Sequence, residues 1–138
     1  MSYSLAVSQA VAILLYICHK TDNERYKYLS TKSISDFLKI PIPTAAKVMK
    51  SLSAKGLIIT KEGAKGGMQL AKEPSEITLL DIFTAIEQER PLFKVQTDYL
   101  YDYDIVMKLR DNIIKSLNNA EMSMKEELAK VSLKDLMN

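Results

Sequence analysis

The chain has 138 residues and a net charge of +2, with 47% hydrophobic and 26% charged residues. These values are typical of one soluble globular domain that is long enough to bury a core. Its single cysteine, Cys18, excludes an internal disulfide and a metal site built from closely spaced thiols. We therefore expect a cytoplasmic protein with no metal and no cofactor.

The first predicted helix covers residues 4–19 and is apolar on nearly every side. Ser8 and Gln9 interrupt its apolar stretch, which is shorter than the roughly 20 residues that a membrane span needs. It lacks the basic segment and the cleavage site of a signal peptide, so we expect a buried core helix and no membrane association. Cys18 lies within it and is either a redox-active thiol or an inert buried one, and the apolar surroundings favour the second.

A pair of short helices joined by a tight turn is predicted next. Ser30 or Thr31 can cap the first helix, and Pro41 prevents it from continuing. The residues of this helix that face inward are predicted to be Ile34, Phe37 and Leu38. Pro43 suits the first position of the second helix. The buried face of the second helix follows from the spacing of Ala45, Val48, Met49 and Leu52.

All four glycines lie between Gly56 and Gly67, which predicts the end of that helix followed by a β-hairpin. Gly56 suits a left-handed helix stop, and Gly63, Gly66 and Gly67 suit the positive φ angles of a hairpin tip. The strands are predicted over residues 57–60 and 68–71. The fold class is therefore mainly α with a small β-hairpin wing, a winged helix-turn-helix.

Positive charge is concentrated on this part of the chain. Residues 37–72 hold seven lysines and one glutamate, a balance of +6, so the remainder of the chain sums to −4. A helix with a cationic outer face beside a lysine-bearing hairpin has the shape and the sign to dock on a phosphate backbone. The alternative is a solvated surface with no partner.

Thr78 and Asp81 are predicted to form a capping box that opens a further helix through Gln88. The residues of this helix that face inward are predicted to be Leu79, Ile82, Phe83 and Ile86. Residues 88–104 are predicted to form a loop. Its aromatic side chains either line an effector pocket or anchor the loop to the core, and they are Phe93, Tyr99, Tyr101 and Tyr103.

A long amphipathic helix is predicted over residues 103–130, and its roughly 28 residues would span about 42 Å. A long helix with an apolar seam usually pairs with a second copy of itself, so we expect a homodimer. The seam is predicted to contain Val106, Leu109, Ile113, Leu117, Ala120 and Met124. Ser132 and Asp135 can cap one last turn that folds back on the body. We divide the chain into a DNA-binding domain, residues 1–88, and a linker loop with the dimerisation helix, residues 89–138.

Four stretches resemble the Rrf2 family of bacterial transcription regulators, and the resemblance covers essentially the whole chain. They are LSAKGL at residues 52–57, GAKGGMQLA at 63–71, EITLLDIFTAIE at 76–87 and VSLKDL at 131–136. The resemblance implies a homodimer crossed through the long helix, with two winged domains on double-stranded DNA at a pseudo-palindromic operator, usually as a repressor. Members that hold an iron–sulfur cluster carry three cysteines before the long helix. Residues 88–104 hold none, so we predict that no cluster is bound.

The start of the second helix is where side chains reach base edges, and the predicted base contacts are Pro43, Thr44, Ala46 and Lys47. The predicted phosphate contacts are Lys50, Lys55, Lys61, Lys65, Gly66 and Gly67. Many relatives carry a tyrosine at Thr44 and some carry an acid at Ala46, so the target sequence should differ from theirs. No arginine lies between Tyr26 and Glu89, so a bidentate arginine contact to guanine is not available from this element.

We therefore predict a dimeric, sequence-specific DNA-binding regulator. The alternative is a protein-interaction module that controls a partner enzyme, with weak or partner-dependent DNA binding. An enzyme is disfavoured, because the sequence offers no nucleophile beside a base, no paired carboxylates and no phosphate-binding loop. The sequence leaves three alternatives for the regulatory signal. They are a small-molecule effector bound between the first helix and the long helix, oxidation of Cys18, and no ligand at all.

Overall fold

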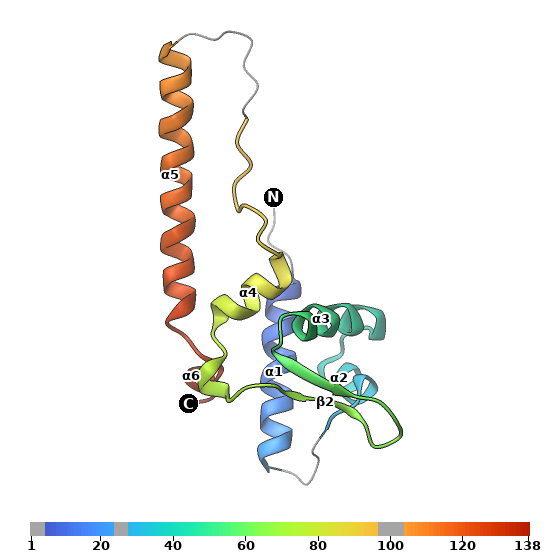
Figure 1. Ribbon diagram of the computed structural model, residues 1–138. Coiled ribbons are helices and arrows are strands. Elements are labelled where there is room, and N and C mark those ends of the chain that lie inside the picture. Colours follow the sequence, from blue (N-terminus) through green and yellow to red (C-terminus); the bar gives the residue numbers. More distant parts are fainter. Residues whose placement is uncertain (1–4, 24–27, 97–103) are drawn as a thin grey trace.

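Figure 1 shows the computed structural model, which describes residues 5–23, 28–96 and 104–138. The central helix, α1 (Ala6–Asn23), contributes the fully buried side chains of Ile13, Leu14 and Ile17. It packs against α2 (Thr31–Leu38), α3 (Ile42–Ala54), β2 (Gly67–Leu70), α4 (Leu79–Glu87) and α6 (Leu133–Met137). The prediction of a buried first helix is therefore confirmed. Among the described residues, no helix combines the length and the apolar content that crossing a bilayer requires.

The end of α1 lies four residues beyond the predicted end at His19. The Thr21 hydroxyl donates to the carbonyl oxygens of Ile17, at 2.8 Å, and Cys18, at 3.3 Å. Because this side chain bonds back to the preceding turn, a polar residue continues the helix instead of ending it. The predicted end of the first helix at residue 19 is therefore wrong, because α1 continues through residues 21–23.

The helix-turn-helix consists of α2 and α3. The Ser33 amide donates to Ser30 Oγ at 3.1 Å, which confirms Ser30 as the cap of α2. Lys39 takes a left-handed conformation, and the buried Ser35 hydroxyl donates to the Ile40 carbonyl, which together tighten the turn. The predicted inner face of α3 is confirmed, because all four of its residues are buried: Ala45, Val48, Met49 and Leu52.

Phe37 does not face inward as predicted. Its side chain is 63% exposed, although Ile34 on the same helix is fully buried. Phe37 lies at the edge of the α2 contact face and stacks on Tyr16 of α1, with ring centroids 4.3 Å apart and an interplanar angle of 9°. One face of its ring is therefore covered and the other is open to solvent.

The wing is an antiparallel hairpin of β1 (Ile58–Lys61) and β2, with Ile58 opposite Leu70. Leu29 bridges to β2 through two backbone hydrogen bonds with Met68, at 2.9 and 2.7 Å. Gly67 has a φ of +148°, and a Cβ there would lie 2.3 Å from the Leu29 carbonyl oxygen. Gly66 does not take the predicted positive φ. It is a glycine because a Cβ would collide with the Lys61 carbonyl oxygen as the hairpin tip closes on β1.

The C-terminal end folds back on the body as predicted. Both capping boxes form, one from Thr78 and Asp81 before α4 and one from Ser132 and Asp135 before α6. A short 3-10 helix, η1 (Pro74–Glu76), packs against α6. The Leu133 amide donates to the Ile77 carbonyl at 2.9 Å, and the Leu133 side chain is fully buried.

The long helix is α5 (Asp104–Ala129), which stands apart from the body and meets it mainly at α4 (Figure 1). None of its residues is buried, and Leu109 and Ile113 are 56% and 49% exposed. The Leu92 amide donates to Glu121 Oε1 at 2.9 Å, so the chain before the helix lies against it. The predicted long helix is confirmed, and its apolar seam is open to solvent in a single chain.

Candidate nucleic-acid interface

The outer face of α3 carries the four predicted base-contact residues. Pro43, Ala46 and Lys47 are exposed and Thr44 is half-buried, because the opposite face of the helix supplies the core. Lys50 is exposed one turn further along. The fold thus brings these side chains onto one accessible surface at the start of a helix.

A hollow of about 500 Å³ lies between α3 and the hairpin, and we call it the wing-side hollow. Ala46 and Lys50 line it from α3, Thr60 and Met68 line it from the two strands, and Thr31 lines it from the start of α2. The hairpin therefore forms a wall along one flank of α3.

A second hollow, of about 690 Å³, lies on the other flank of α3, and we call it the α4-side hollow. Thr44, Lys47 and Ser51 line it from α3, and Gln9 lines it from the first turns of α1. Arg90, just beyond the end of α4, also lines it. The exposed surface of α3 is therefore a ridge between two hollows.

The predicted phosphate-contact residues of the wing lie around its tip. Lys65 is exposed in the turn between the strands, next to Gly66 and Gly67. Lys61 Nζ lies 5.5 Å from the centroid of the Tyr28 ring, a cation–π distance that positions this ammonium group beside β1. The wing thus carries cationic groups at its tip and at the end of β1 that leads into the tip.

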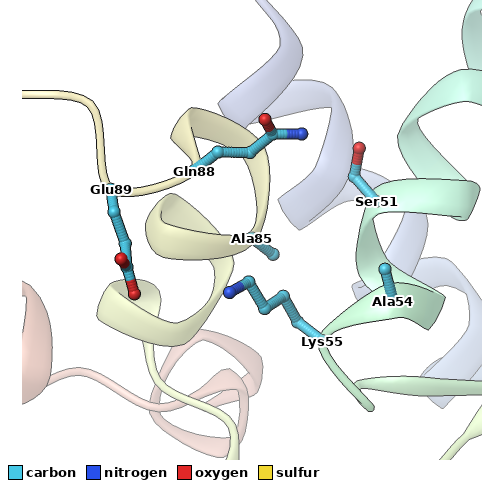
Figure 2. Close-up of a pocket in the computed structure, with 6 residues that line it drawn as sticks. All are labelled: Ser51, Ala54, Lys55, Ala85, Gln88 and Glu89. Atoms are coloured by element: carbon cyan, nitrogen blue, oxygen red, sulfur yellow. The ribbon is translucent and has the colours of Figure 1, made fainter.

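Lys55 has a different setting from the other lysines. It lines a small hollow of about 310 Å³ between the ends of α3 and α4, together with Ala54, Ala85 and Gln88. Figure 2 shows its side chain extending toward α4. Lys55 is the exposed C-cap residue of α3, where an ammonium group complements the partial negative charge of the helix end.

Cys18 is buried, with 1% of its surface exposed. Its Sγ donates to Met137 Sδ of α6 at 3.4 Å, so the thiol lies at the contact between the first and last helices. Of the aromatic residues predicted for the effector pocket, Phe93 is half-buried, and Tyr99, Tyr101 and Tyr103 lie outside the described residues. The hollows described above lie around α3 and not between α1 and α5.

Arg90 and Gln9 are interface candidates that sequence reasoning missed. They come from segments far apart in the sequence, and only the packing of α1, α3 and α4 brings them beside Lys47. The available signal was that Arg90 is the first arginine after the lysine-rich segment.

A family model described as "Rrf2: Iron-dependent Transcriptional regulator" matches residues 3–138. The chain belongs to the Rrf2 family. YwnA of Bacillus subtilis, named as an HTH-type transcriptional regulator, is 30% identical over 96 residues, which are 70% of this chain and 72% of YwnA. An HTH-type regulator of Aquifex aeolicus is 38% identical over 82 residues, 59% of this chain and 54% of that protein, little more than half its length.

The Rrf2 fold is also seen in a solved structure, that of CymR, described as the global cysteine regulator of B. subtilis. It superposes with a TM-score of 0.67 over 99% of this chain and 95% of CymR, at 22% identity. The family match and the named relatives place the chain among transcriptional regulators and not among enzymes.

The family description names iron, so we asked whether the side chains of this chain could hold an iron–sulfur cluster. Thiolates are what hold iron–sulfur clusters. The chain has one cysteine, which is buried in α1, and residues 88–104 have none. Within residues 5–23, 28–96 and 104–138, no group of three histidine, cysteine or acidic side chains is placed to hold a metal ion. The residues present do not fit a cysteine-held cluster.

Proposed function

We propose that this Rrf2 protein is a homodimeric, sequence-specific DNA-binding repressor that works without an iron–sulfur cluster. The observation that carries the proposal is the exposed ridge of α3, with Thr44, Lys47 and Lys50 beside a lysine-bearing wing. An α-helix of this kind fits the major groove, about 12 Å wide, and a hairpin can follow the adjacent backbone.

The residues at the start of α3 contact the bases. Lys47 can donate to the O6 and N7 acceptors of guanine, and the methyl groups of Thr44 and Ala46 can pack on a thymine methyl. Pro43 is the second residue of α3 and lies in the turn that enters the groove. The phosphate contacts fall to Lys50, Lys61 and Lys65, with the backbone of Gly66 and Gly67 close to the groove edge. Lys55 contributes positive charge from the end of α3.

Dimerisation falls to α5. Its seam contains exposed Leu109, Ile113 and Ala120 and half-buried Val106, Leu117 and Met124. Burying such a seam against a second copy removes apolar surface from water and relates two α3 helices by a two-fold axis. Residues 1–88 would then be the DNA-binding domain, and residues 89–138 the linker loop and dimerisation helix. Repression follows when a dimer on promoter DNA excludes polymerase from the same base pairs.

The proposal is tested by binding of the purified protein to DNA upstream of its own gene and to a shuffled fragment of equal length. Fluorescence anisotropy at about 150 mM salt should show at least about a thousandfold preference for the natural fragment, which is the lower end for specific DNA-binding proteins. Equal binding to the two fragments, repeated for fragments selected from the whole genome, would remove the sequence-specific part of the proposal.

A further inference from the structure

The ridge of α3 lies between two hollows, but the proposed phosphate contacts of Lys50 and the wing lie only on the side of the wing-side hollow. The wing forms one wall of the wing-side hollow and carries the lysines that are proposed to contact phosphate on that flank. When a helix enters the major groove, a sugar–phosphate strand lies along each of its flanks. The α4-side hollow is on the flank that faces the strand away from the wing.

The charge of the α4-side hollow suits an anion. Lys47 and Arg90 supply two positive charges and Glu87 supplies one negative charge, so the charged side chains sum to +1. Gln9 adds an amide that can donate. The first turns of α1 and α3 also line the hollow, and the amide groups of a helix start carry partial positive charge.

The backbone conformation after α4 brings Arg90 to the α4-side hollow. Gln88 and Glu89 both take left-handed conformations, with φ of 55° and 57°, which non-glycine residues adopt rarely. The Arg90 amide donates to the Glu87 carbonyl at 3.3 Å, so the chain turns back beside the helix end. Gln88 is the C-cap of α4, where a left-handed residue is common, and the second left-handed residue, Glu89, turns the chain so that Arg90 lines the α4-side hollow.

We propose that Arg90 and Gln9 bind a phosphate of the DNA strand on the flank of α3 opposite the wing. The inference rests on the proposed DNA-binding function and extends it, because the recognition helix is then held on both flanks. Arg90 supplies the guanidinium–phosphate contact that the arginine-free segment of residues 27–88 does not offer.

A backbone phosphate fits the α4-side hollow better than a free metabolite does. Small-molecule sites orient their ligand with a few polar groups inside a largely enclosed apolar pocket. Here Lys47 and Arg90 are exposed, and Gln9, Thr44 and Ser51 are only half-buried. Thr44 and Lys47 also belong to the proposed base-reading surface, so DNA on that surface would cover the hollow.

The test compares Arg90→Gln with Gln9→Lys, which adds a cation at the same site, and with Lys134→Gln, a charge-matched control in α6, which packs against η1 and α1. Affinity for the operator is measured between 50 and 300 mM salt. Arg90→Gln should weaken binding by on the order of tenfold per dimer and flatten the slope of log affinity against log salt by about 1.8, one contact per protomer. Gln9→Lys should tighten binding and steepen the slope, a gain that misfolding cannot produce.

The inference fails if Arg90→Gln and Gln9→Lys both bind like Lys134→Gln while Lys47→Gln is weakened, an outcome that leaves the proposed function standing. A second arm adds inorganic pyrophosphate at constant ionic strength. Pyrophosphate should displace DNA from the wild-type protein and from Arg90→Gln. The pyrophosphate concentration that displaces half of the bound DNA should rise in proportion to the DNA affinity of each protein. If Arg90→Gln instead keeps wild-type DNA affinity and loses only its response to pyrophosphate, the hollow belongs to a free anion and the inference is overturned.

Discussion

Lys47 and Lys65 occupy different parts of the proposed interface, so substituting them should change DNA binding in different ways. Lys47 lies on the ridge of α3, whereas Lys65 lies at the exposed tip of the wing. Lys47→Gln should cost about 1–3 kcal/mol on the operator and much less on random DNA, because a base contact is lost. Lys65→Gln should weaken binding to both DNAs equally and reduce the salt slope by about 0.9 per protomer.

Salt titrations of both variants on both DNAs check this assignment. Lys134→Gln in α6 serves as the control for the loss of one positive charge. An equal loss of affinity on operator and random DNA for Lys47→Gln would mean that this residue contacts phosphate and reads no base.

Gly67 and Gly63 offer a second comparison at the residue scale. Both take a positive φ, but a Cβ would collide with the Leu29 backbone at Gly67 and would meet nothing within 4 Å at Gly63. Gly63→Ala should therefore cost about 1 kcal/mol of unfolding free energy through backbone strain alone. Gly67→Ala should cost clearly more, because the bridge from Leu29 to Met68 must also shift.

Urea unfolding followed by circular dichroism measures both costs. Equal losses for the two alanine variants would show that the collision with Leu29 is relieved without disturbing the bridge to the wing.

At the scale of elements, α6 is held by its capping box. The amide and the hydroxyl of Ser132 hydrogen-bond with Asp135, and they hold the pKa of the Asp135 carboxyl below its ordinary value. Because this pKa is lowered on folding, the carboxylate stabilises α6 above the pKa of the unfolded chain. The stabilisation is lost as the pH falls through the lower, folded pKa.

Ser132→Ala removes the hydroxyl but keeps the backbone amide, which is the larger cause, so it should raise the pKa of Asp135 only part of the way toward the ordinary aspartate value, near 3.9. Carboxyl chemical shifts followed by NMR during an acid titration measure it. An unchanged titration midpoint in Ser132→Ala would show that the Ser132 hydroxyl does not contribute to the lowered pKa.

Local signals made the elements predictable. The caps at Ser30, Thr78 and Ser132 and the left-handed stop at Gly56 act within a few residues, so their structures follow from the sequence. The exposure of Phe37 depends on where Tyr16 lies, and the α4-side hollow depends on the packing of three helices. Such features arise from tertiary contacts, which spacing along one helix does not encode.

At the scale of the whole molecule, the exposed seam of α5 is the feature that a single chain leaves unexplained. Ile113→Glu places a charge at the centre of the seam and should convert the proposed dimer into monomers with weak operator binding, because burying an unpaired charge is costly. Asn118→Glu adds the same charge on the opposite side of α5 and should leave the dimer intact.

Sedimentation velocity measures the oligomeric state of both variants, and circular dichroism checks that each variant keeps its helical content. A wild-type protein that sediments as a monomer at micromolar concentration would contradict the assigned role of α5.

We propose that two α3 ridges, related by a two-fold axis, read one DNA site. Selection of bound fragments from a random DNA library by the purified protein, followed by sequencing, tests this most directly. We predict an enriched pseudo-palindrome whose half-sites lie one or two helical turns apart, and the enrichment should disappear with Lys47→Gln. A pool that stays unenriched after repeated rounds, or that yields a single half-site with no symmetric partner, would contradict the account.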